Sequence, residues 1–179
     1  MLNLSVNKVI KNGYISLGFQ AFPILAALIL IPINLKAYGN ELWGTYVLSI
    51  NIIFMFLYLS IGINPTINYE LPKLLKEKNH EKIKILLSNG FYVNLFISLF
   101  FGLLIFLGSK FIAYNIYSIK SEEFINIIKL SALCGSISLM ISFFRNVFEA
   151  KQEFYLVSLN RVIISVSIFL VPFIFYYQN

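Results

Sequence analysis

The chain has 179 residues, of which 59% are hydrophobic and 12% charged, and its mean hydropathy is +0.80. Soluble domains carry about 25% charged residues, so this composition indicates a membrane protein. The sequence has no Asp, eight Glu, one His and one Cys, which argues against most enzymes, a metal site and an intrachain disulfide. The net charge is +6, and most of the basic residues lie between apolar runs. This position favours the anionic surface of a bilayer over nucleic acid as their partner.

Five apolar runs are long enough to cross a bilayer, because a hydrocarbon core about 30 Å thick needs roughly 20 helical residues. They lack the alternation of apolar and polar residues that marks barrel strands. The runs are Gly13–Ile33, Leu42–Ile63, Gly90–Gly108, Phe124–Phe144 and Tyr155–Tyr177. The sequence thus predicts an all-α, polytopic transmembrane helix bundle with five spans, forming one transmembrane domain over residues 1–179.

The distribution of lysine and arginine predicts the orientation of these spans, since cytoplasmic loops hold the excess of positive charge. Alternate loops carry nine such residues on one side and three on the other. We therefore expect a cytoplasmic N-terminus, an outer C-terminus and a basic cytoplasmic loop at residues 64–89. Both halves of that loop mix Leu or Ile with Lys, which suits either short interfacial helices or a solvated connector.

Each predicted span also contains polar or small residues at roughly helical spacing. Such a pattern arises either from a polar interior or from close helix packing, for which small residues four apart suffice. We expect Pro23, near the middle of the first span, to kink its helix or to leave a carbonyl unpaired. The positions are Ser16, Gln20, Pro23 and Ala27; Gly44, Asn51, Tyr58 and Gly62; Gly90, Asn94, Ser98 and Gly102; Ser131, Gly135, Ser138 and Ser142; Ser158, Arg161, Ser165 and Pro172.

Two charged side chains, Lys129 and Arg161, lie within the predicted spans, and an ionisable residue inside a membrane is a candidate functional residue. Each is about 8–9 Å from the start of its helix, so each side chain can also snorkel to the nearest interface. Asn160 adds a second polar group beside Arg161. Both interpretations, substrate contact and snorkelling, remain open at this stage.

The first part of the chain carries a recognisable order of features. A basic N-terminus precedes a glycine-containing first span that ends Ile31-Pro32-Ile33, and a short outer segment follows with Gly39, Trp43 and Gly44. A second span then leads to the Lys/Glu-rich loop. This order resembles the polysaccharide and oligosaccharide flippases of the multidrug/oligosaccharidyl-lipid/polysaccharide exporter superfamily, in layout over the whole chain and in motif mainly over residues 13 to 90.

The resemblance implies a fold and a function. Members of that family are similar in having twelve to fourteen helices in two lobes around a central cavity, and they move lipid-linked sugars by alternating access. Five spans would make only part of the first lobe, so we expect a fragment that needs C-terminal helices or a second polypeptide. The expected substrate is an undecaprenyl-pyrophosphate-linked oligosaccharide, with Arg161 attracting the pyrophosphate, Gln20, Asn51 and Asn94 along the sugar path, and Asn160 nearby.

Three alternatives belong beside this interpretation. A drug or lipid exporter of the same superfamily often has a coupling carboxylate in this lobe, and none of the five spans contains one. A membrane glycosyltransferase generally uses Asp-rich metal motifs, which this chain lacks. A non-transporting scaffold is the third. We expect a non-enzymatic protein of the bacterial inner membrane, with no cofactor or metal and with membrane lipids around it.

Overall fold

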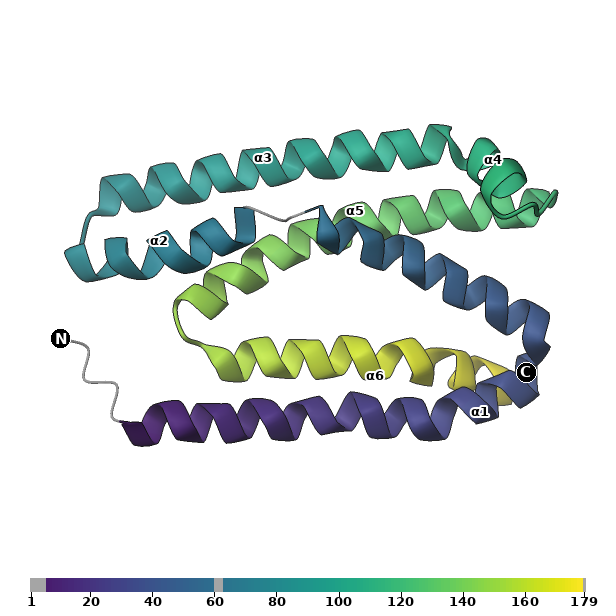
Figure 1. The fold of residues 1–179 in the computed structure, drawn as a ribbon, viewed down its shortest axis with the longest axis horizontal. Coiled ribbons are helices and arrows are strands. Elements are labelled where there is room, and N and C mark those ends of the chain that lie inside the picture. The colour runs from purple at the N-terminus through teal and green to yellow at the C-terminus, as the bar shows by residue number, and fades with distance from the viewer. Residues whose placement is uncertain (1–5, 60–62, 179) are drawn as a thin grey trace. The chain divides into compact units, whose positions relative to one another are not determined.

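The computed structural model describes residues 6–59 and 63–178, with side chains at 21–59 and 64–177. Every regular element in these residues is helical, as the all-α class requires (Figure 1). In chain order the elements are α1 Val6–Tyr58, α2 Ile63–Glu77, α3 His80–Leu107, α4 Ser109–Phe111, the π-helix η1 Ile112–Ile116, α5 Glu122–Ala150 and α6 Phe154–Gln178.

Four helices in the described ranges are long and apolar enough to cross a membrane, which confirms the polytopic class and corrects the predicted count of five. They are Ala21–Tyr58, His80–Leu107, Glu122–Ala150 and Phe154–Tyr177. The difference arises in α1, which counts as one helix although Gly39 divides it. The first predicted span lies in α1 before Gly39, and most of the second lies in α1 after it. Helical backbone continues through Pro23 and Pro32 and breaks at Gly39 (φ 75°, ψ 172°), where a positive φ favours glycine. This break lies within the expected outer segment.

The chain divides into two compact units, each described by itself. The first consists of Met1–Trp43 and Gln152–Asn179, and the second of Gly44–Lys151. The first unit therefore pairs the N-terminal part of α1 with α6, while the second contains the rest of α1 together with α2, α3, α4, η1 and α5.

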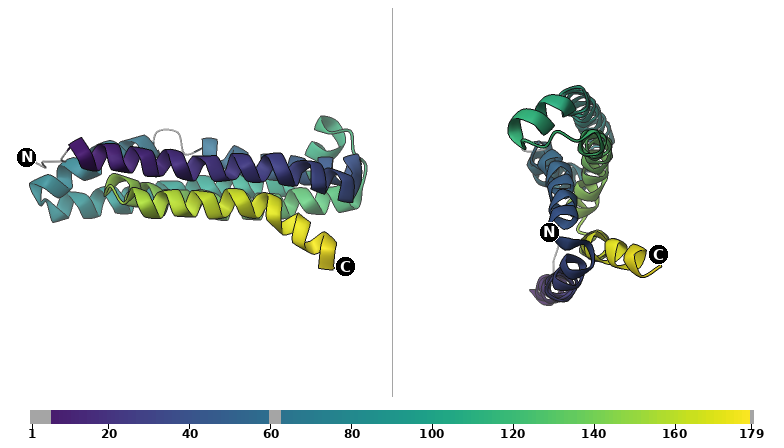
Figure 2. Two further views of the ribbon diagram at one scale, coloured as in Figure 1. Left: turned by 90° about the horizontal axis from the view of Figure 1, so that it is seen from below. Right: turned by 90° about the vertical axis from the view of Figure 1, so that its right-hand side faces the viewer.

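In the first unit, polar side chains of α1 contact α6 around Pro172. Asn34 Nδ2 donates to the Phe169 carbonyl at 2.9 Å, and the Tyr38 hydroxyl donates to the Pro172 carbonyl at 2.7 Å. Proline lacks an N–H and disturbs the hydrogen bonds of the preceding turn, and in membranes neighbouring helices commonly supply the donors that the disturbed carbonyls need. Figure 2 shows α6 bending in its yellow, C-terminal part.

In the second unit, α3 and α5 run side by side and antiparallel (Figure 1). Small residues make this possible: a Cβ added at Gly90 would meet Phe143, and one added at Gly102 would meet Ser136. The Ser98 hydroxyl donates to the Ser136 carbonyl at 2.9 Å, and the Ser136 hydroxyl donates back to the Ser98 carbonyl at 3.1 Å. These contacts belong to close helix packing, the second explanation given for the polar stripes.

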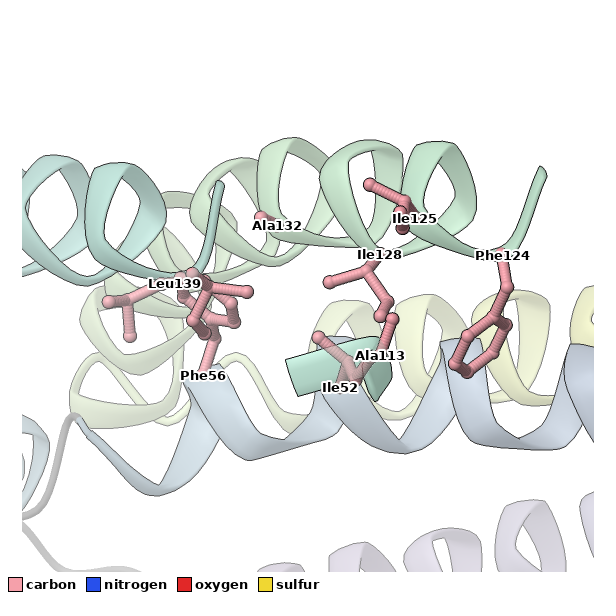
Figure 3. Packing of buried hydrophobic residues seen from close by; sticks show 9 residues of the cluster. Ile52, Phe56, Ala113, Phe124, Ile125, Ile128, Ala132 and Leu139 are labelled. Carbon is pink, nitrogen blue, oxygen red and sulfur yellow. The ribbon is translucent and has the colours of Figure 1, made fainter. Parts of the chain in front are cut away.

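Large apolar side chains fill the space between the helices of this unit. The main cluster, drawn in Figure 3, joins Ile52 and Phe56 of α1 to Ile128, Ala132 and Leu139 of α5. A second cluster joins α2 to α5 through Ile67, Leu71, Phe143 and Ala150. The opposite faces of these helices leave many large apolar residues exposed, as lipid-facing surfaces do.

The segment 64–89, expected as a basic cytoplasmic loop, forms most of α2 and the beginning of α3. A short turn joins them: Lys78 has a φ of 54°, and Asn79 Oδ1 accepts from the Lys82 N–H at 3.1 Å, which caps α3. The pKa of Lys73 lies above its usual value, first because of its contact with the Tyr69 side chain and then because of the Glu70 carboxylate at 3.4 Å. Which side of the membrane this segment faces stays a prediction.

Candidate functional site

The candidate residues divide between the two units. Asn160 and Arg161 lie on α6 in the first unit, and Asn51 and Asn94 lie on α1 and α3 in the second. Gln20 belongs to α1, but its side chain lies outside the described residues. Among the candidates whose side chains are described, no hydrogen bond joins one to another, so each is considered in its own surroundings.

Asn94 is the candidate that the helices enclose. Its side chain is 0% exposed, and neither its Oδ1 nor its Nδ2 has a hydrogen-bond partner among the described residues. It lies one turn after Gly90 and one turn before Ser98, two of the positions at which α3 approaches α5. A buried amide left without partners costs roughly 1–3 kcal/mol, so this side chain stands ready to accept and donate hydrogen bonds.

Asn160 and Arg161 are both exposed on α6, and Asn51 is exposed on α1. Within the described part of the chain, the Arg161 guanidinium forms no ion pair with a carboxylate. An exposed, unpaired guanidinium is a strong partner for phosphate, which it can bind through two parallel hydrogen bonds. The same exposure also lets the side chain reach the membrane surface, as the snorkelling interpretation requires.

Sequence reasoning missed Asn34, the fully buried side chain that bonds the Phe169 carbonyl. It falls one residue beyond the predicted first span, in a segment expected to lie outside the membrane. Pro172 was the residue from which such a contact could have been predicted, because the carbonyls freed by a proline in a spanning helix often accept a hydrogen bond from a neighbouring helix. The sequence alone did not indicate which helix supplies that donor.

Two of the cavities among the described residues lie on the second unit. One, of about 410 Å³, lies between α2 and α3, and its lining includes Ile67, Ile85, Leu86 and Val93 together with Lys82. The other, of about 460 Å³, lies where α3 ends and α5 begins, and it contains Lys110 and Lys129. Among the described residues there is no cluster of three or more His, Cys, Asp or Glu side chains that could hold a metal ion.

Comparison with known proteins gives one weak similarity. The chain is 22% identical over 172 residues to a Shigella flexneri protein named "Putative O-antigen transporter". The aligned region covers 96% of this chain but only 41% of that protein, so the chain spans about two fifths of the length of its curated relative. No protein-family profile matches the chain, and no solved structure matches it. The chain is therefore similar to a transporter, at a level that suggests a flippase-like family and no more.

Proposed function

We propose that this chain is the N-terminal part of a flippase that moves a lipid-linked oligosaccharide, carried on undecaprenyl pyrophosphate, across the bacterial inner membrane. The similarity to the O-antigen transporter over nearly the whole chain carries this proposal. The four long apolar helices support it, because a protein that moves a substrate across a bilayer must itself span the bilayer. The proposal includes further helices, C-terminal or in a second polypeptide, that complete the cavity.

The proposed roles follow from the chemistry of the side chains. Arg161 attracts the pyrophosphate, since it is exposed and unpaired among the described residues. Asn51, Asn94, Asn160 and Gln20 line the sugar path, where amides donate to and accept from hydroxyl groups. Asn94 is enclosed by its bundle, so contact with a sugar requires α3 and α5 to separate near that turn.

In the proposed orientation the N-terminus is cytoplasmic and the C-terminus lies outside. This needs an odd number of crossings, so in the proposal the two parts of α1, before and after Gly39, each cross the membrane. Positive charge supports this assignment through the positive-inside rule. One tag is placed after residue 179 and another in the turn at Lys78, and each is labelled with a reagent that cannot cross the membrane. Because the reagent reaches one side only, each tag reports its own side. Labelling of both tags from the same side contradicts the proposed topology.

The direct test of the substrate is a binding measurement on the purified full chain. The probe is a short-chain prenyl pyrophosphate that carries one sugar. We expect Arg161→Ala to weaken binding about tenfold, the loss typical of one charge-assisted hydrogen bond. Lys151→Ala is the matched control, because Lys151 is also basic and exposed but ends α5 outside the proposed path.

Three outcomes oppose the proposal. Equal binding of the probe by wild type and Arg161→Ala removes the role of Arg161. A similar loss in Lys151→Ala shows that general positive charge, not a defined site, attracts the probe. Failure of the folded wild-type chain to bind the prenyl pyrophosphate more tightly than phosphatidylglycerol rejects the proposed substrate.

A further inference from the structure

The cavity at the junction of α3 and α5 brings together side chains that are distant in sequence. Its volume is about 460 Å³, and it is bounded by the end of α3, by α4 and η1, and by the beginning of α5. Lys110 enters from α4 and Lys129 from α5. In the sequence Lys129 is a candidate on its own, for substrate contact or for snorkelling, and no sequence pattern connects it with Lys110.

The two ammonium groups leave this cavity positively charged. Glu122 is the carboxylate of its lining, and within the described ranges neither lysine forms an ion pair with it or with another carboxylate. The neighbouring groups are rings: Lys129 Nζ lies 5.8 Å from the Phe106 ring centroid, and Lys110 Nζ lies 5.7 Å from that of Tyr114. A ring attracts a cation without neutralising it, so the cavity favours an anionic occupant.

The rest of the lining limits what that anion can be. Phe106, Leu107 and Ile125 provide an apolar wall beside the two lysines. The cavity also lies at the end of α3 and the beginning of α5, two antiparallel apolar helices. For helices that cross the bilayer, this is the level of the lipid phosphates. A charged group next to an apolar wall at this depth matches an amphiphile, with its phosphate at the lysines and an acyl chain along the wall.

We propose that this cavity binds an anionic phospholipid, with Lys110 and Lys129 holding the headgroup phosphate and Phe106, Leu107 and Ile125 contacting the acyl chain. Both lysines can contact one phosphate group because they line the same cavity, Lys110 from α4 and Lys129 from α5. The bound lipid joins α4 to α5 and so stabilises the junction between α3 and α5. This site uses none of the residues assigned to the proposed oligosaccharide path and does not depend on transport.

The test titrates the purified full chain with phosphatidylglycerol or with zwitterionic phosphatidylcholine and counts bound lipid by native mass spectrometry. We expect phosphatidylglycerol to bind more tightly, and Lys110→Gln and Lys129→Gln each to weaken its binding about fivefold, or about 25-fold together. Lys129→Arg keeps the charge and should retain binding. Lys120→Gln is the matched control, since Lys120 is exposed between η1 and α5 but does not line the cavity.

Several results overturn the proposal. One is equal binding by the double variant and wild type, and another is an equal loss in Lys120→Gln, which indicates diffuse attraction to the bilayer. Displacement of phosphatidylglycerol by millimolar inorganic phosphate assigns the cavity to a soluble phosphate group instead of a lipid.

A second measurement needs no substitution and covers the case in which a glutamine variant fails to fold. Wild-type chain in phosphatidylglycerol or phosphatidylcholine nanodiscs is acetylated with a lysine reagent, and each site is quantified by mass spectrometry. We expect phosphatidylglycerol to slow acetylation of Lys110 and Lys129 more than that of Lys120. Equal protection of all three lysines contradicts the proposed site.

Discussion

The contact between Gly135 of α5 and Phe56 of α1 predicts a marked response to a very small substitution. A Cβ added at Gly135 would collide with the ring of Phe56, whose Cε2 and Cγ atoms would lie 2.6 and 2.8 Å away. Phe56 is 0% exposed and belongs to the main apolar cluster, so its ring has no free space to enter. Gly135→Ala therefore forces either the ring or the helix to move.

The magnitude follows from two opposing effects. Alanine favours a helix over glycine by about 0.8–1 kcal/mol, whereas overpacking a filled core costs about 1–3 kcal/mol. We therefore expect Gly135→Ala to lower the free energy of unfolding by up to about 2 kcal/mol. Gly44→Ala is the matched control, because it is also a helical glycine and its added Cβ would meet nothing within 4 Å. That variant should gain up to about 1 kcal/mol.

The assay is reversible unfolding of the full chain from mild micelles by sodium dodecyl sulfate, followed by near-ultraviolet circular dichroism. A second background, Phe56→Leu, removes ring atoms from the collision and should make Gly135→Ala less costly than it is in wild type. The reasoning is refuted if Gly135→Ala is as stable as Gly44→Ala. It is also refuted if the cost of Gly135→Ala is unchanged in the Phe56→Leu background.

Two further predictions concern buried asparagines. Asn34→Leu removes the donor to the Phe169 carbonyl beside Pro172 and should lower the free energy of unfolding in micelles by up to about 1.7 kcal/mol, the largest value for a hydrogen bond between membrane helices. The loss stays below that value because the substitution also removes Asn34 Oδ1, which is buried without a partner among the described residues. Asn94→Leu has nearly the same volume and removes an amide with no partner among the described residues, so it should leave stability unchanged or increase it, as measured by the same unfolding assay. The same Asn94 variant should weaken binding of the prenyl pyrophosphate sugar probe if Asn94 lines the proposed path.

Asn51→Leu is the control for both asparagines, because Asn51 is exposed on α1 and changes no buried contact. A stability of Asn34→Leu equal to that of Asn51→Leu contradicts the role of Asn34 at the proline. A strong loss of stability in Asn94→Leu shows that the amide has a partner that stabilises the fold.

The sequence by itself determined the fold class and the positions of the later helices. Runs of about 20 apolar residues must satisfy their own backbone hydrogen bonds in lipid, and a helix does so with local bonds alone. The predicted spans 124–144 and 155–177 accordingly fall inside α5 and α6. The all-α, polytopic class could be predicted from these apolar runs alone, because the hydrogen bonds within a helix do not depend on contacts between helices.

The tertiary structure decided what depends on contacts between distant residues. The sequence ended the first span at Ile33, yet the helix continues to Gly39, because proline does not forbid helical backbone when neighbouring groups compensate. The spacing of Asn94 was visible in the sequence, but its burial was not, because burial depends on where α5 lies against α3. Lys110 and Lys129 come to line one cavity for the same reason, since a connection between antiparallel helices brings together residues that the chain separates.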